Sequence, residues 1–235
     1  DPFFTDLKNI KFDVKEGEIY GIAGVAGNGQ SELMDILTGE NTIIDSGSII
    51  FNKINIECFN PKKRRDLSIA FVPENRLGHS AVPELTLSEN ILLSQFPNNN
   101  FISNGIINHQ NIESHVNKVI SEFNVVASGS EALASSLSGG NLQKFVIGRE
   151  ILSHPKLLII SHPTWGIDAG AEFAIRESLI NLSKQGTSII VLSQDLDELF
   201  EITHRIAVIF NGSLSNSYRT KDINIEKIGL LMGGA

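Results

Sequence analysis

A glycine-rich loop, Gly24–Ser31, lies between a short apolar segment and a segment of helix-forming residues. Its sequence, Gly-Val-Ala-Gly-Asn-Gly-Gln-Ser, has the glycine spacing of a phosphate-binding loop. Glycines let the backbone curl so that successive N–H groups converge on a phosphate, and the helix N-terminus adds its positive dipole. Such loops carry a charged lysine where Gln30 stands, whereas Ser31 retains the hydroxyl that would ligate Mg²⁺. From this loop alone, a turn that binds nothing remains an open alternative.

A second anion-binding pattern occurs at Leu137–Lys144, which reads Leu-Ser-Gly-Gly-Asn-Leu-Gln-Lys. Ser138 is a suitable N-cap, and apolar residues follow at Phe145–Ile147. A Ser-Gly-Gly sequence at the start of a helix again presents backbone N–H groups toward an anion. The sequence therefore contains two separate segments of the kind that contact phosphate.

Polar residues follow two apolar strands in the C-terminal half. The strand predicted at Leu157–Ile160 ends before Ser161 and His162, where phosphate-loop enzymes place an acidic magnesium ligand. The strand predicted at Ser188–Leu192 is followed by Gln194, and Asp168 lies in the turn after the first of these strands. These positions are candidates for the chemistry around a bound nucleotide.

An alternation of strands and helices is predicted to position these residues. Ile19–Ala23 reads as a buried strand that enters the glycine loop, and Gln30–Leu37 reads as the helix that leaves it. Repeated strand–helix units favour parallel strands with right-handed crossovers. The other elements expected are a strand carrying Ile10, Phe12 and Val14, a hairpin at Gly47–Ile56, strands at Ser68–Val72 and Ile206–Phe210, and helices at Ala169–Lys184 and Asp195–Ile202. We expect an α/β core at 1–84 and 153–235, interrupted by a helical insertion at 85–152.

Composition narrows the class of protein. The chain has 235 residues, 41% of them hydrophobic, and a formal charge of −8, so it can bury a sizeable core and presents little of the basic surface that duplex nucleic acid requires. Its single cysteine, Cys58, cannot close an internal disulfide. The basic run at Lys62–Arg65 is expected to be a solvated face, and the absence of Met at Asp1 predicts a fragment of a longer polypeptide.

The order of these motifs resembles that of an ATP-binding-cassette (ABC) transporter ATPase over nearly the whole chain. More narrowly, the segments Gly21–Gln30, Phe71–Arg76 and Pro163–Asp168 are similar to the C-terminal half of the double-cassette ATPases of bacterial nucleoside and simple-sugar importers. Gln194–Leu199 and Gly229–Gly234 resemble the nucleoside branch. The resemblance implies one ABC-type phosphate-loop domain over 1–235, with a mostly parallel sheet, an antiparallel β edge and a helical signature subdomain.

The resemblance assigns roles to matching positions. Ser161 and His162 would be the Walker B pair, Asp168 the D-loop aspartate, Glu74 the Q-loop residue and Gln194 the switch position. Phe3 or Phe4 would stack on adenine, with packing in the core or a free chain end as the alternative. The nucleotide-binding positions in and after the loop would be Gly24, Gly27, Asn28, Gly29, Gln30, Ser31 and Glu32, and the signature positions would be Leu137, Ser138, Gly139, Gly140, Asn141 and Gln143.

Several of these positions depart from the family pattern. Gln30 replaces the lysine, Ser161 the metal-orienting aspartate, His162 the catalytic glutamate and Gln194 the histidine, and Glu74 stands in place of glutamine. Phosphoryl transfer depends on positioned charge, so no catalytic residue is expected in this half's own site. ATP is the expected ligand, with Mg²⁺ bound weakly at Ser31 or absent.

The resemblance implies a division of labour between two cassettes. The intact signature would complete the catalytic site of the N-terminal cassette of the same chain, and the assembly would hydrolyse ATP to drive solute import. Expected partners are membrane permease subunits and, indirectly, a substrate-binding protein, at the cytoplasmic face of the bacterial inner membrane. Two alternatives stay open: a dimerisation module that binds no nucleotide, and a soluble ABC ATPase that is not coupled to transport.

Overall fold

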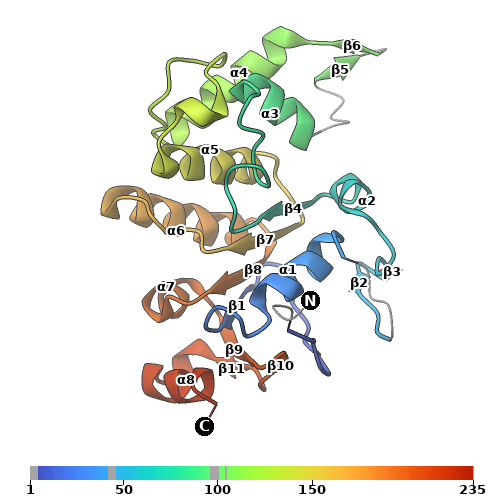
Figure 1. The fold of residues 1–235 in the computed structure, drawn as a ribbon, viewed down its shortest axis with the longest axis vertical. Helices are drawn as coiled ribbons and strands as arrows, with labels where there is room; N and C mark the ends of the chain where they lie inside the picture. The colour runs from blue at the N-terminus through green and yellow to red at the C-terminus, as the bar shows by residue number, and fades with distance from the viewer. Residues whose placement is uncertain (1–4, 42–45, 96–100, 104, 235) are drawn as a thin grey trace. The chain divides into compact units, whose positions relative to one another are not determined.

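The computed structural model describes residues 5–41, 46–95, 101–103 and 105–234. They divide into two compact units (Figure 1). The core unit comprises the described residues of Asp1–Phe71, Pro155–His162 and Leu179–Ala235, and the signature unit comprises those of Val72–His154 and Pro163–Ser178. Strand β4 (Ile69–Val72) and helix α6 (Ala169–Lys184) run from one unit into the other. The domain boundaries expected at 84/85 and 152/153 stay a prediction.

A mostly parallel sheet organises the core unit. Seven strands among the described residues form it in the order β10-β9-β1-β8-β7-β4, with β11 also paired to β9. Strands β1, β8, β7 and β9 are mutually parallel where they pair, and β10 and β11 run antiparallel to β9, as the expected antiparallel edge requires. Their bounds are β1 Ile19–Ala23, β7 Leu157–Ser161, β8 Ser188–Ser193, β9 Arg205–Phe210, β10 Ser213–Leu214 and β11 Tyr218–Arg219.

The remaining elements of the core unit follow the expected alternation. The predicted hairpin at Gly47–Ile56 is present as β2 (Ile50–Phe51) and β3 (Ile54–Asn55), which pair around Asn52 and Lys53 in left-handed conformations. Its helices are α1 Gln30–Thr38, α2 Pro61–Asp66, α7 Leu196–Ile202, α8 Ile225–Met232 and the 3₁₀ turn η2 Thr220–Asp222.

Helices dominate the signature unit. Helix α4 (His109–Glu122) contacts both α3 (Leu87–Ser94) and α5 (Gly139–Ile151). Each of the three has a side-chain N-cap, from Thr86, Asn108 and Ser138 respectively, so their starts are encoded locally. The unit also contains a short hairpin, β5 (Ile102–Ser103) with β6 (Ile106–Ile107), and the 3₁₀ turn η1 (Ala134–Ser136).

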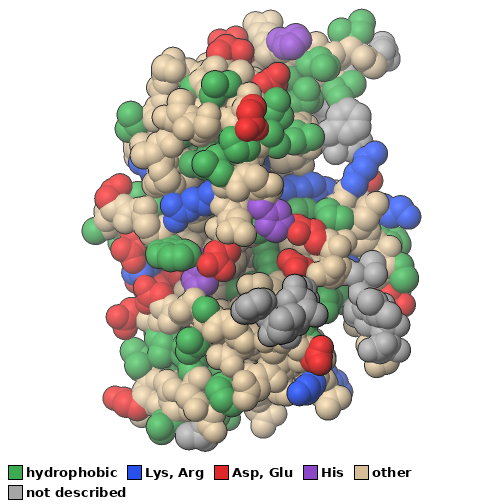
Figure 2. All heavy atoms as spheres, viewed as in Figure 1, with side chains coloured by type: hydrophobic (Ala, Val, Ile, Leu, Met, Phe, Trp, Pro, Cys, Tyr) green, Lys and Arg blue, Asp and Glu red, His purple; other side chains and the backbone are tan. Residues whose placement is uncertain are grey.

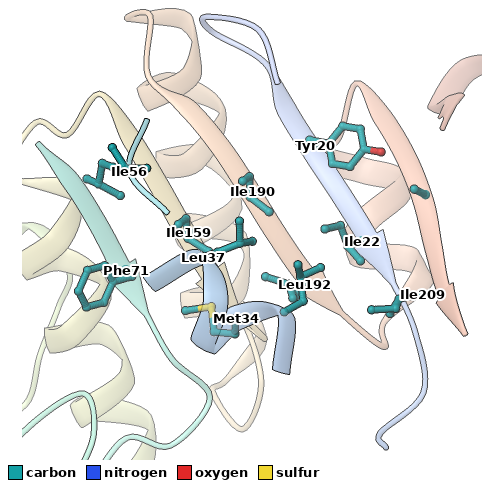
Figure 3. Close-up of a cluster of buried hydrophobic side chains, with 13 residues drawn as sticks. Tyr20, Ile22, Met34, Leu37, Ile56, Phe71, Ile159, Ile190, Leu192 and Ile209 are labelled. Carbon is teal, nitrogen blue, oxygen red and sulfur yellow. The ribbon is translucent and has the colours of Figure 1, made fainter. Parts of the chain in front are cut away.

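The hydrophobic core of the core unit lies between α1 and one face of the sheet (Figure 3). Met34 and Leu37 project from α1 toward the strands that carry Ile159 and Ile190. Burial of each such side chain contributes about 1.5–3 kcal/mol, so this packing fixes the helix that follows the glycine loop. On the face drawn in Figure 2, acidic and basic side chains are interspersed.

The prediction of a strand carrying Ile10, Phe12 and Val14 is wrong. Residues 10–15 form no β-ladder among the described parts of the chain, although the three apolar side chains are partly buried against the core. Phe12 stacks on Tyr20 with ring centroids 5.2 Å apart. The alternation therefore records side-chain packing on an extended segment and not backbone pairing.

Within the described residues, no helix combines the length and the apolar character needed to cross a membrane.

Candidate nucleotide-binding site

Three parallel strands end side by side at the edge of the sheet that carries the glycine loop. Ala23 of β1 is in register with Ser193 of β8, and Leu192 is in register with Ser161 of β7. The glycine loop follows the first of these strand ends, Gln194 the second and His162 the third. The carboxyl edge of a parallel sheet is the usual ligand position in open α/β folds.

The loop backbone is shaped by its glycines. Gly27 has a φ of +83° and a Cβ there would meet nothing within 4 Å, so open space lies beside it. Gly29 has a φ of +109° and begins α1 without any side-chain cap. The first N–H groups of α1 are therefore not occupied by a capping side chain, which suits an anion at this helix start.

Two of the predicted nucleotide-contact residues, Asn28 and Glu32, accept hydrogen bonds from other segments of the core unit. The Asn28 side-chain oxygen accepts from Asn211 N at 3.0 Å, and the Asn28 carbonyl accepts from Gly212 N at 3.0 Å. Oε1 of the Glu32 side chain accepts from Thr5 N at 2.9 Å. These two side chains are therefore engaged in contacts within the core unit.

Gln30, the residue in the lysine position, turns into the protein. Its side chain is only 7% exposed, and Nε2 donates to the carbonyl oxygens of Ile22 at 3.2 Å and Ser193 at 3.3 Å. An amide nitrogen has two hydrogens, so both are used to tie β1 to β8. Neither is available to a phosphate in this arrangement.

The predicted metal-binding and hydrolytic positions lie in the same unit. Ser31 is exposed, Ser161 is buried at the end of β7, and His162 is also buried, with a φ of +47°. Gln194 is exposed after β8, in a turn that Ser193 holds through its hydroxyl. Mg²⁺ prefers carboxylate and other oxygen ligands in octahedral geometry, and hydroxyls alone fit it poorly. No cluster of three or more His, Cys, Asp or Glu among the described residues could hold a metal.

The signature sequence begins α5, as expected. Ser138 Oγ accepts from the backbone N of Asn141 at 3.4 Å and from its Nδ2 at 2.9 Å, and Asn141 Oδ1 accepts from Val126 N at 2.8 Å. Ser138 and Gly139 are exposed, Leu137 and Gly140 are half-buried, and a Cβ at Gly140 would lie 3.3 Å from the carbonyl oxygen of Gly166. The first turn of α5 is therefore accessible and fixed.

Two other predicted residues of the signature unit, Gln143 and Asp168, make hydrogen bonds within or to the segment that leads into α6. Gln143 is 2% exposed, and its Nε2 donates to the carbonyl of Pro163 at 3.2 Å. Asp168 is exposed at the start of α6, where Oδ1 accepts from Ala171 N at 3.0 Å. That backbone hydrogen bond is the main cause that lowers the pKa of Asp168, so its carboxylate is ionised at neutral pH.

Sequence reasoning assigned no role to Arg76, although it lies in the quoted segment Phe71–Arg76. Its guanidinium donates to the Trp165 carbonyl and lies against Gly139 and Gly166. Glu74, two residues earlier, is exposed. An arginine four residues after a strand, within a Pro-Glu-Asn-Arg turn, is the signal that could have drawn attention to it.

The predicted site residues thus fall into two groups. The core unit holds the loop residues with Ser161, His162 and Gln194, and the signature unit holds Glu74, the signature residues and Asp168. Phe3 and Phe4 lie outside the described residues, so their stacking stays a prediction. A strand, a glycine loop and a helix at the carboxyl edge of a parallel sheet define a phosphate-loop nucleotide-binding protein.

Comparison with known proteins identifies the family. The family model described as ABC transporter matches residues 7–165, and the chain therefore belongs to the ABC transporter family. In fold it is similar to the dimeric structure of a bacterial ABC transporter cassette, with a TM-score of 0.79 and 22% identity over 91% of this chain and 90% of that one. A dimeric post-hydrolysis cassette bound to ADP and Pi gives a TM-score of 0.78 and 21% identity, with the same coverage of 91% and 90%.

Curated relatives are more similar in sequence. Nucleoside import ATP-binding protein NupA of Lactococcus lactis is 40% identical, over 97% of this chain and 45% of that protein. Guanosine import ATP-binding protein NupO of Bacillus subtilis is 37% identical, with 97% and 45% covered, and ribose import ATP-binding protein RbsA of Lactococcus lactis is 34% identical, with 98% and 46% covered. The chain spans less than half the length of these relatives.

Proposed function

We propose that this chain is an ATP-binding cassette of a bacterial ABC importer for nucleosides or simple sugars. Three relatives with import functions in their names support this proposal, and two of them are named for nucleosides. The cassette would bind ATP through its glycine loop and dock on membrane permease subunits. A substrate-binding protein would deliver solute to those permease subunits. The cassette would work at the cytoplasmic face of the membrane without spanning it.

The cassette's own hydrolytic site is degenerate in this proposal. The observation that carries this part is the side chain of Gln30, whose two amide hydrogens are used by the carbonyls of Ile22 and Ser193. Ser161 supplies no carboxylate where a metal-orienting one is expected. Loss of these charges removes transition-state stabilisation of the order of several kcal/mol. ATP would therefore be held here, with Mg²⁺ weakly bound or absent, and would not be turned over.

The signature then completes the active site of a second cassette. Its exposed Ser138 and Gly139, at the start of a long helix, offer backbone N–H groups to the phosphates of the partner's nucleotide. The relatives are about twice as long as this chain, which leaves room in them for that second cassette. In this proposal the partner cassette belongs to the same polypeptide, as the sequence resemblance implies.

The test compares Ser138→Arg with Gln30→Ala and His162→Ala in the full-length two-cassette protein reconstituted with its permease. Ser138→Arg is expected to lower ATPase activity about 100-fold, because it blocks a set of oxyanion-type donors. Gln30→Ala and His162→Ala are expected to retain activity within about threefold. Strong loss with Gln30→Ala and none with Ser138→Arg would overturn the proposal. Uptake of a radiolabelled nucleoside or ribose by the same vesicles tests coupling to transport.

Titration with a fluorescent ATP analogue, with and without Mg²⁺, distinguishes the alternatives. ATP affinity that scarcely changes with Mg²⁺ supports a site that binds nucleotide without hydrolysing it. Complete absence of affinity, with the partner cassette present, would instead support the dimerisation module. Mg²⁺-dependent turnover that is lost with His162→Ala would show a working ATPase and contradict the proposed degeneracy.

A further inference from the structure

The turn that follows β4 is a closed and internally bonded loop. Within Pro73–Ala81, Ser80 N donates to Asn75 O at 3.1 Å, Ala81 N to Arg76 O at 2.8 Å, and Gly78 N to Ala81 O at 2.8 Å. The backbone of Arg76 is fixed within this loop because its carbonyl accepts the hydrogen bond from Ala81 N. Its side chain therefore leaves the loop from a defined position.

The Arg76 guanidinium fills a space that two glycines leave open. Nη2 donates to the Trp165 carbonyl oxygen. A Cβ at Gly139 would lie 3.1 Å from Nη1, and a Cβ at Gly166 would lie 3.2 Å from Nη2. A planar guanidinium fits such a narrow space between backbone segments, whereas an ammonium cannot donate in the same fixed directions.

The same loop is also hydrogen-bonded to the C-terminal end of α5, the helix that begins at the signature. Ser80 Oγ donates to the Pro73 carbonyl at 3.2 Å, and the Ser80 carbonyl accepts from Arg149 Nη2 at 2.9 Å. Arg149 forms a buried ion pair with Glu150 at 2.8 Å, in the last turn of α5. The loop thus contacts α5 at its start through Arg76 and at its end through Ser80.

We infer that Arg76 is a positioning residue for the signature. It holds the first signature glycine and the Trp165–Gly166 turn in one fixed arrangement, and its loop links that arrangement to Glu74. The inference rests on the proposed function, in which the N–H groups of the signature act on a partner's nucleotide. Such donors work only when held within about 0.5 Å of the productive geometry, and a misplacement of about 1 Å lowers the rate by up to about 100-fold.

The test uses Arg76→Met and Arg76→Lys in the full-length transporter, with Lys118→Ala as the control. Lys118 is an exposed cation of the same unit, and it pairs with Glu122 one turn along its own helix, α4. ATPase kcat and KM are measured well below the melting temperature of each variant. Arg76→Met is expected to lower kcat at least tenfold with KM within about twofold, Arg76→Lys to lie between, and Lys118→Ala to match the parent.

A spectroscopic signal distinguishes positioning from general loss of structure. Trp165 is the one tryptophan in the 235 residues, so a fluorotryptophan label gives a ¹⁹F resonance that Trp165→Phe assigns in the full-length protein. The resonance is expected to move in Arg76→Met and not in Lys118→Ala. A kcat within twofold of the parent in Arg76→Met, or an unmoved resonance, would overturn the inference. If Ser138→Arg also leaves turnover intact, the proposed function fails; if Ser138→Arg abolishes turnover, only the role of Arg76 fails.

Discussion

Nη1 of Arg64 lies 2.6 Å from the carbonyl oxygen of Leu37, in the last turn of the helix that begins at the glycine loop. The Arg64 side chain is fully buried, so the expectation of a solvated face at Lys62–Arg65 is wrong at this residue. Its guanidinium also donates to the carbonyls of Ile36, Ile56, Glu57 and Phe59. Carbonyls at the end of a helix have no partner within the helix, so this buried cation caps α1. Burial lowers the pKa of Arg64, yet arginine stays protonated.

Removal of this cap is expected to destabilise the chain strongly. Arg64→Met removes a donor from five carbonyl oxygens, of which the bonds to Leu37 and Ile56 are buried, and we expect a loss of about 3 kcal/mol or more in the free energy of unfolding. Urea denaturation followed by circular dichroism measures it. Lys62→Met, on the exposed side of α2, the helix that carries Arg64, is the matched control and is expected to change stability by less than about 0.5 kcal/mol. Equal effects of the two substitutions would contradict the capping role.

Restoration of a lysine at position 30 is expected to strengthen nucleotide binding. Gln30→Lys adds the charge that phosphate loops use, and a charge-assisted hydrogen bond of about 1.5–3 kcal/mol corresponds to roughly tenfold or more in affinity. Gln30→Leu removes the bonds to Ile22 and Ser193 and is expected to lower stability by about 1–3 kcal/mol without a gain in affinity. Calorimetric titration with ATP compares the two; unchanged affinity in Gln30→Lys would show that the loop cannot present a charge to phosphate.

Gly148 allows α5 to approach Phe123, the C-cap residue of α4. A Cβ at Gly148 would lie 2.5 Å from Cδ2 of Phe123, closer than carbon atoms pack. Gly148→Ala is therefore expected to destabilise the chain by about 1–3 kcal/mol. Phe123→Leu should relieve part of that strain, so the double variant is expected to be more stable than the sum of the single changes predicts. Thermal unfolding of the four proteins measures the coupling, and strict additivity would refute the contact.

The free energy of unfolding is expected to depend on pH through the protonation of His115. Burial is the main cause that lowers its pKa below 6.5, Lys118 and His154 act in the same direction, and Glu122 opposes them. Below pH 6.5 the unfolded chain binds a proton that the folded chain resists, so the stability contributed above pH 6.5 is lost as the pH falls toward the lowered pKa. His115→Phe, which keeps a ring beside Phe101, should flatten the curve between pH 7 and pH 5. An unchanged slope in that variant would assign the dependence to other groups.

The predictable parts of this protein are those with local signals. Strand β1, the glycine loop and α1 follow directly from apolar runs and glycine spacing, and Ser138 was identifiable as an N-cap because its side chain bonds three residues ahead. The extended segment around Phe12 was misjudged because alternation reports side-chain burial and gives no information on a backbone partner. The inward turn of Gln30 and the contact of Arg76 with Trp165 join residues far apart in sequence, and no local pattern encodes them.

The phosphate loop and the signature belong to different compact units, and this has an evolutionary consequence. The bonds of Gln30 lie within the core unit, and those of Ser138 and Arg76 lie within the signature unit. Substitutions in one motif therefore leave the internal contacts of the other intact. If the proposed division of labour holds, selection on the loop can therefore relax while the signature stays constrained, because neither set of contacts depends on the other.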